Sequence, residues 1–138
     1  METTNQTKTL NIILWISQII LAGMFIMAGY MKTTMPIEQL SALLPWTKDV
    51  PVWLVRFIGA SEFLGALGLI LPSLLRIKPI LTPIAALGII AIMVMAAIFH
   101  VTRTEFSGAV FTVILASVAA FIGWGRWKKV LIQSKNQK

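Results

Sequence analysis

The chain has 138 residues, of which 57% are hydrophobic and 12% are charged, with a net charge of +7 and a mean hydropathy of +0.84. Soluble domains carry about 25% charged residues, so this composition excludes an ordinary soluble domain and predicts an integral membrane protein. The absence of cysteine excludes thiolate catalysis, iron–sulfur ligation and covalent haem attachment, and one histidine with few carboxylates predicts no metal site.

The first predicted membrane span covers about residues 10–31, after a short polar tail at residues 1–8. No charged residue interrupts the chain between Lys8 and Lys32. Roughly 20 apolar residues cross a hydrocarbon core about 30 Å thick. A signal-peptide core has only about 7–15 apolar residues, so we expect this stretch to be retained as a helix.

The connection at residues 32–51 contains three prolines and apolar residues at helical spacing. This pattern predicts a short amphipathic helix that lies in the membrane interface. Three further predicted spans follow, and Pro72 ends the first of them. They cover about residues 52–71, 80–100 and 107–127.

Because the connections between the later spans are short, consecutive helices are expected to be antiparallel neighbours. The sequence therefore predicts an all-α fold, an antiparallel bundle of four transmembrane helices with a short interfacial helix between the first two spans. We treat residues 1–138 as a single membrane domain that ends in a basic tail at residues 128–138.

The distribution of basic residues predicts the orientation of this bundle. The side with both termini and the connection between the second and third spans carries eight Lys and Arg residues, whereas the other side carries four. We therefore predict a multi-pass protein of the cell membrane, either a plasma or an inner membrane. By the positive-inside rule, both of its termini face the cytoplasm. The basic residues lie at membrane edges and indicate contact with the lipid bilayer, not with nucleic acid.

Glu62 is the most informative residue because it lies ten positions into the second span, about 15 Å from Val52 at ~1.5 Å per residue. An acid at this depth costs about 2.5–3.5 kcal/mol and usually faces the interior of a bundle. Gly59 and Gly65, at i−3 and i+3, allow another helix to approach this face. Alternatively, Glu62 is a buried acid with only a packing role. Arg56 either leans inward over Gly59 or extends to the headgroups.

A polar face on the first span leads toward the same region. Asn11, Gln18 and Lys32 are separated by multiples of seven residues, which places them on nearly one side of the helix. Lys32 lies at the outer end of this face. The alternative interpretation of Lys32 is a flank that only sets topology.

We hypothesise that Glu62, His100 and Lys32 converge on one water-accessible pocket in the outer half of the bundle. His100 ends the third span, and its alternative interpretation is an ordinary interfacial histidine. We assign no catalytic residue. The remaining candidate site residues adjoin or support this pocket: Arg56, Gly59, Gly65, Gln18 and Glu105.

Residues 57–72 read F-I-G-A-S-E-F-L-G-A-L-G-L-I-L-P, which closely resembles the F-I-G-x-x-E-x-L-G-A-x-G-L-I-L-P core of DoxX-like membrane proteins. The resemblance spans roughly residues 12–125. It implies a compact four-helix membrane bundle with recurrent polar residues at Lys32, Glu62 and His100. The family takes its name from subunits associated with thiosulfate and quinol oxidation, and other relatives act with redox-defence enzymes or as membrane assembly factors.

Two classes of function follow. In the first, the protein is not an enzyme alone but binds a quinone-like small molecule, or serves a membrane or redox enzyme partner, with Glu62 and His100 exchanging protons. In the second, it is a non-catalytic assembly factor or partner-binding protein that uses its Gly- and Ala-rich helix faces. A small-solute transporter is a weaker third interpretation, because four helices leave little room for alternating access. The oligomeric state stays open.

Overall fold

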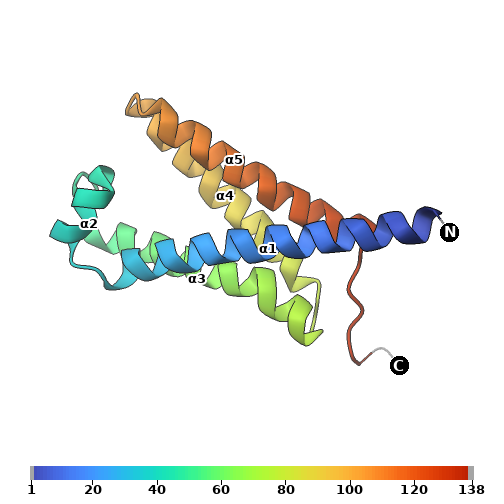
Figure 1. The fold of residues 1–138 in the computed structure, drawn as a ribbon. Helices are drawn as coiled ribbons and strands as arrows, with labels where there is room; N and C mark the ends of the chain where they lie inside the picture. Colours follow the sequence, from blue (N-terminus) through green and yellow to red (C-terminus); the bar gives the residue numbers. More distant parts are fainter. Residues whose placement is uncertain (1, 137–138) are drawn as a thin grey trace.

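The computed structural model describes residues 2–136, and all of its regular structure over this range is helical (Figure 1). Four long helices are each apolar and long enough to cross a membrane. They are α1 (Glu2–Thr34), α3 (Val52–Leu75), α4 (Leu81–Thr102) and α5 (Phe106–Trp124). Three short elements complete the fold: α2 (Ile37–Leu43), the 3-10 turn η1 (Pro45–Lys48) and the π-helical turn η2 (Gly125–Lys129). The predicted all-α bundle of four spans is confirmed.

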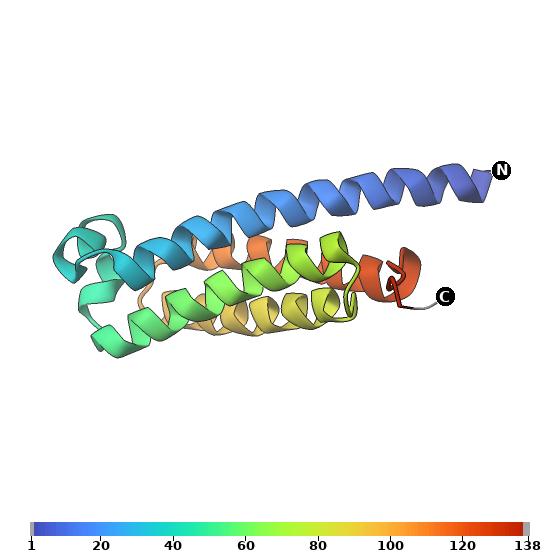
Figure 2. The same ribbon diagram turned by 90° about the horizontal axis from the view of Figure 1, so that it is seen from below.

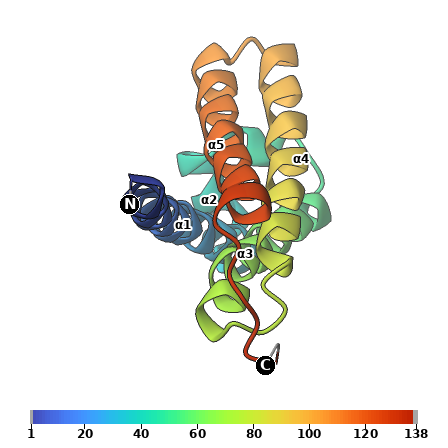
Figure 3. The same ribbon diagram turned by 90° about the vertical axis from the view of Figure 1, so that its right-hand side faces the viewer.

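The long helices form two antiparallel pairs, α1 with α3 and α4 with α5, which join mainly where α3 packs against α4. Figure 3 views the bundle along its length and shows these two pairs. Both chain ends and the turn between α3 and α4 lie at one end of the bundle, which we call the terminal end (Figure 2). The opposite end, with α2, η1 and the turn between α4 and α5, is called the distal end.

The core is a column of apolar side chains along the bundle axis. Leu21, Phe25, Leu69, Ile89 and Ile122 are each at most 3% exposed. Many other large apolar side chains point outward from all four long helices. Helices that are apolar on all sides are typical of membrane spans, where lipid covers the outer surface.

Two helices extend beyond the spans predicted from the sequence. α1 begins at Glu2 rather than near residue 10, so the expected polar tail continues the helix. This stretch contains no Gly or Pro, and adding a residue to an existing helix is favourable for most residue types. α3 passes through Pro72 to Leu75, so this proline lies inside the helix and does not end it as predicted. The helix ends instead at Arg76, which has a left-handed φ of 57°.

Candidate functional site

The site begins where α1 crosses α3, because glycines lie on both helices at this point. A β-carbon at Gly29 would come 2.6 Å from the carbonyl oxygen of Gly59 and 2.8 Å from the amide nitrogen of Phe63. A β-carbon at Gly59 would come 2.6 Å from the β-carbon of Lys32. Only glycine permits such an approach of two helix backbones. Lys32 and Glu62 each follow their glycine by three residues, on the same face of the helix.

Lys32 and Glu62 form a buried ion pair at this crossing. Nζ of Lys32 lies 2.7 Å from each carboxylate oxygen of Glu62. The two residues are only 8% and 3% exposed. An ammonium group has three N–H donors, and among residues 2–136 Nζ donates only these two hydrogen bonds. One donor of Lys32 is therefore available to another acceptor.

Arg56 and Trp46 hold Lys32 from two other sides. The carbonyl of Lys32 lacks a helical partner, because the residue four positions later is Pro36, which has no N–H. Nη1 of Arg56 donates a hydrogen bond of 2.7 Å to this carbonyl oxygen. The ammonium of Lys32 lies 5.8 Å from the centroid of the Trp46 ring, within the range of a cation–π contact. Arg56 thus positions Lys32 through the backbone.

A second polar group lies at the distal end, between α4 and α5. Nδ1 of His100 lies 2.7 Å from Oε2 of Glu105, and Nε of Arg103 donates to Oε1 of Glu105 at 2.9 Å. Nη2 of Arg103 also lies 2.8 Å from Oδ2 of Asp49. The hydrogen bonds from His100 and Arg103 lower the pKa of Glu105. A carboxylate accepts from Nδ1, so Nε2 of the neutral His100 ring is left as an acceptor.

A cavity of about 440 Å³ lies between these two groups. Small-molecule sites commonly have volumes of about 300–1,000 Å³ with a few convergent polar groups. All four long helices and the connection between α1 and α3 contribute to its walls. The polar lining residues are Lys32, Ser61, Glu62, His100 and Thr112. The aromatic lining residues are Phe25, Trp46, Phe57, Phe99 and Phe111.

Three of the candidate residues taken from the sequence, Lys32, Glu62 and His100, line this one cavity. Glu105 contacts the ring of His100, and Arg56 contacts the backbone of Lys32. His100 forms no direct hydrogen bond with the ion pair in the part of the chain that the structure describes. The cavity therefore separates an ion pair on α1 and α3 from an imidazole on α4.

Two candidate residues lie elsewhere. Gly65 faces α4, where a β-carbon would come 3.0 Å from the Ile89 side chain. Gln18 is fully buried and hydrogen bonds to Leu69 on α3 and to Arg126 after α5. The seven-residue spacing placed Gln18 on the face of Lys32, but fourteen residues of helix separate them by about 21 Å. Gln18 therefore belongs to the terminal half of the bundle.

Sequence reasoning missed Trp46 and Asp49 as site residues, and it counted Arg126 with the basic tail. The length of the connection between α1 and α3 could have indicated Trp46 and Asp49, since long connections in compact bundles are often functional. The signal for Arg126 is the polar face of α1. Asn11 and Gln18 cannot both be buried without a polar partner on another helix.

This arrangement offers a specific chemistry. The Lys32 ammonium can donate one further hydrogen bond, and Nε2 of His100 can accept or carry a proton. Aromatic rings lie between them, which suits a flat apolar molecule with oxygen atoms at its edge. Within residues 2–136, no group of three or more His, Asp or Glu side chains could hold a metal ion.

A family model described as the DoxX-like family matches residues 16–122. The matched region includes the ion pair of Lys32 and Glu62 and the contact between His100 and Glu105, and it ends before Arg126. No curated protein and no solved structure matches the chain.

Proposed function

The chain belongs to the DoxX-like family of membrane proteins, and we propose that it binds a quinone-like small molecule in the cavity beside Lys32 and Glu62. In this proposal the protein is an accessory component of a membrane redox process. The observation that carries it is a buried ion pair with a spare donor on the wall of an aromatic cavity of about 440 Å³.

The lining residues fit this class of ligand. The spare N–H of Lys32 suits a quinone carbonyl oxygen, while Nε2 of His100 suits a ligand hydroxyl. Phe99 and Trp46 offer faces and edges to a planar ring. When bound, a quinone would supply two-electron redox chemistry, for which the chain alone has no redox centre.

The protein's own residues would bind the ligand and hold a proton. Glu62 keeps the Lys32 ammonium charged and oriented, because a buried ammonium without an anion is strongly disfavoured. Glu105 accepts a hydrogen bond from Nδ1 of His100, which directs a transferred proton to Nε2. The apolar wall excludes water from the bound ring. Protons would therefore enter and leave the ligand at His100.

The proposal also puts this cavity in the outer half of a cell membrane. In the sequence, the side of the predicted spans with both termini carries eight basic residues and the other side four, so the positive-inside rule favours cytoplasmic termini.

The test is a titration of purified protein in lipid nanodiscs with a short-chain benzoquinone, followed by tryptophan fluorescence. Trp46 lines the cavity, whereas Trp53 is 69% exposed and lies outside its lining. We expect saturable quenching in the wild type and in Trp53→Phe, and loss of most of that quenching in Trp46→Phe.

A second comparison tests the role of the ion pair. Lys32→Met combined with Glu62→Leu removes both charges together, which avoids a lone buried charge and preserves the fold. We expect quinone affinity to fall about tenfold, the equivalent of one charge-assisted hydrogen bond. Unsaturable quenching, or equal affinity in this variant, would overturn the proposal. Crosslinked capture of immature membrane proteins from native membranes would then favour an assembly factor.

A further inference from the structure

A second site lies at the terminal end, far from the ion pair, and is centred on Arg126. This residue is only 5% exposed, in the turn η2 that follows α5. Its Nε donates to Oε1 of Gln18 at 2.6 Å, and its Nη1 donates to Oδ1 of Asn11 at 2.7 Å. The guanidinium also lies 5.1 Å from the centroid of the Trp15 ring. All of these partners are neutral.

No acidic side chain in the described part of the chain pairs with Arg126. The ion pairs found among residues 2–136 involve Lys32, His100 and Arg103, and none involves Arg126. The third guanidinium nitrogen, Nη2, is buried and has no hydrogen-bond partner in the described part of the chain. A buried charge normally has an ionic partner, and a buried donor normally has an acceptor. The described protein groups around Arg126 therefore supply neither an anion for its charge nor an acceptor for Nη2.

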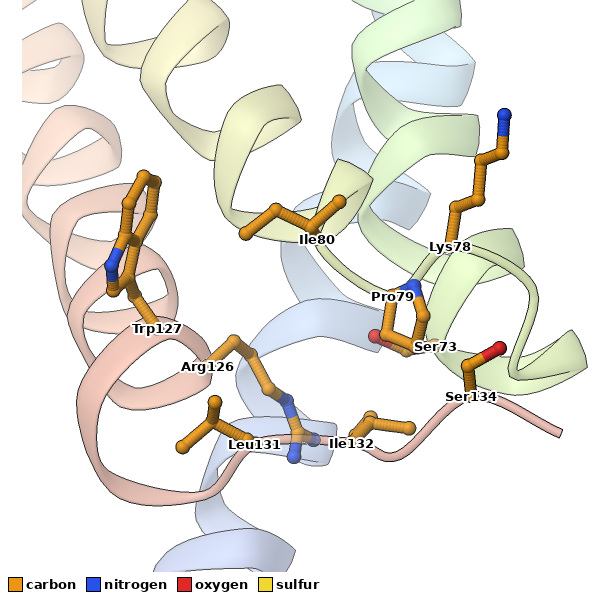
Figure 4. A pocket seen from close by; sticks show the side chains of 9 residues that line it. All are labelled: Ser73, Lys78, Pro79, Ile80, Arg126, Trp127, Leu131, Ile132 and Ser134. Atoms are coloured by element: carbon orange, nitrogen blue, oxygen red, sulfur yellow. The ribbon is translucent and has the colours of Figure 1, made fainter. Parts of the chain in front are cut away.

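Arg126 lies in the wall of a cavity of about 480 Å³ at this end of the bundle (Figure 4). Figure 4 shows its side chain reaching from η2 toward Ile132, with Trp127 on one side and Ser73 and Ser134 on the other. Lys78 also lines the cavity. Its side chain points away from Arg126 in this view, but lysine has a flexible four-carbon stem.

The chain after η2 closes this cavity by binding to the turn between α3 and α4. The amide of Lys135 donates to the carbonyl oxygen of Arg76 at 3.0 Å, and Nε of Arg76 donates to the carbonyl oxygen of Gln133 at 2.9 Å. Arg76 and Lys78 have positive φ angles of 57° and 45°, which turn the chain sharply at this point. The cavity is thus a built site, with three separate chain segments in its walls.

The charge distribution of the whole protein favours an anion here. Among residues 2–136, the terminal end carries seven basic residues and one acidic residue, Glu2, whereas the distal end carries four of each sign. Almost the whole net charge of +7 is therefore at the end that contains Arg126. Such a field attracts anions, including the anionic headgroups of lipids.

We propose that this cavity binds a phosphate group, with Nη2 of Arg126 as its buried donor and Lys78 as a second cation. Arg is well suited to phosphate oxygens because its planar donors match their geometry. The hydroxyl of Ser134 can donate to a remaining oxygen. The phosphate belongs either to an anionic lipid headgroup or to a soluble phosphate compound. This site is independent of the proposed quinone cavity.

The experiment uses the full chain in micelles of a maltoside detergent, which contains no phosphate group. In one arm, inorganic phosphate is added against chloride at equal ionic strength, and the thermal unfolding midpoint is measured. In the other arm, phosphatidylglycerol is included, and retained lipid is measured by native mass spectrometry. An effect of phosphate alone identifies a soluble ligand, and selective lipid retention identifies a headgroup. An effect in neither arm overturns the proposal.

Variants separate the site from general electrostatic attraction. Arg126→Gln should weaken binding about tenfold, by loss of a charge-assisted hydrogen bond. Lys78→Gln should weaken it about fivefold. Lys128→Gln is the matched control, because it removes the same charge from an exposed residue at the same end, outside the cavity lining. If Arg126→Gln does not fold, the comparison of Lys78→Gln with Lys128→Gln still tests whether phosphate binds in this cavity. Equal losses in both lysine variants would contradict a defined site.

Discussion

Gly59 lies against the β-carbon of Lys32, so closely that a β-carbon at position 59 would come within 2.6 Å of it. This relationship joins the packing of α1 on α3 to the geometry of the ion pair. The backbones must approach at Gly29 and Gly59 before Lys32 can reach Glu62 with both hydrogen bonds. A small residue on each helix therefore controls a charged contact one turn away.

The first prediction compares two glycines. Gly59→Ala should destabilise the bundle by about 1–3 kcal/mol, because the methyl group forces α1 and α3 apart. Gly23→Ala is the control, since nothing lies within 4 Å of a β-carbon there. It should be neutral or stabilise the helix by about 0.5–1 kcal/mol. Unfolding in detergent measures both, and an equal effect of the two variants would refute the close-packing argument.

The second prediction concerns the coupling of Lys32 with Glu62. Each single replacement, Lys32→Met or Glu62→Leu, should destabilise the protein by about 3–5 kcal/mol, because it leaves one buried charge without its partner. The double variant should be much closer to wild type than the sum of the two losses. A double-mutant cycle on the free energy of unfolding gives this coupling. Strict additivity would show that the two groups do not interact.

The third prediction concerns acid stability at the distal end. The hydrogen bonds from His100 and then Arg103 lower the pKa of Glu105 in the folded protein. A carboxyl group with a lowered pKa stabilises the fold above its unfolded pKa, and this contribution is lost as the pH falls through the folded pKa. Glu105→Gln should therefore destabilise the protein near neutral pH and have progressively less effect in acid.

The control for this pH dependence is Glu38→Gln. Glu38 is exposed on α2 and takes part in none of the ion pairs found in residues 2–136. Its replacement should leave the acid branch of the stability curve unchanged. Thermal unfolding midpoints across the acidic range measure both variants. A constant effect of Glu105→Gln at every pH would argue against a role for its charge.

The fourth prediction tests the orientation. The chain contains no cysteine, so single cysteines can be introduced without background labelling. Gln39 on α2 and Gln133 near the C-terminus are exposed at opposite ends of the bundle. With cytoplasmic termini, a membrane-impermeant maleimide should label Gln39→Cys in intact cells and Gln133→Cys only after permeabilisation. The reverse pattern would invert the topology and place the ion-pair cavity in the inner half.

The spans could be predicted from the sequence because each is a predominantly apolar stretch, with at most two charged residues, that is long enough to cross a bilayer. The small residues beside Glu62 also indicated the face that meets another helix. The extension of α1 to Glu2 could not be predicted. Hydrophobicity locates only the part of a helix inside the membrane, and residues 2–9 contain no Gly or Pro that would mark its first turn. The partners of Gln18 and Arg126 could not be predicted either, because they depend on the rotation of α5 about its axis. Spacing within one helix carries no information about that rotation.

Gln18 forms hydrogen bonds with two parts of the chain that are synthesised long after it. Its amide group bonds to Leu69, 51 residues later, and to Arg126, 108 residues later. Chains are synthesised from the N-terminus, so α1 and α3 can associate in the bilayer while α5 is still inside the ribosome. The side-chain oxygen of Gln18 can accept its hydrogen bond from Arg126 only after η2 has been synthesised. A pair of α1 and α3 without Arg126 therefore leaves the buried Oε1 of Gln18 without this donor, and the terminal half of the bundle is complete only when η2 has packed against α1.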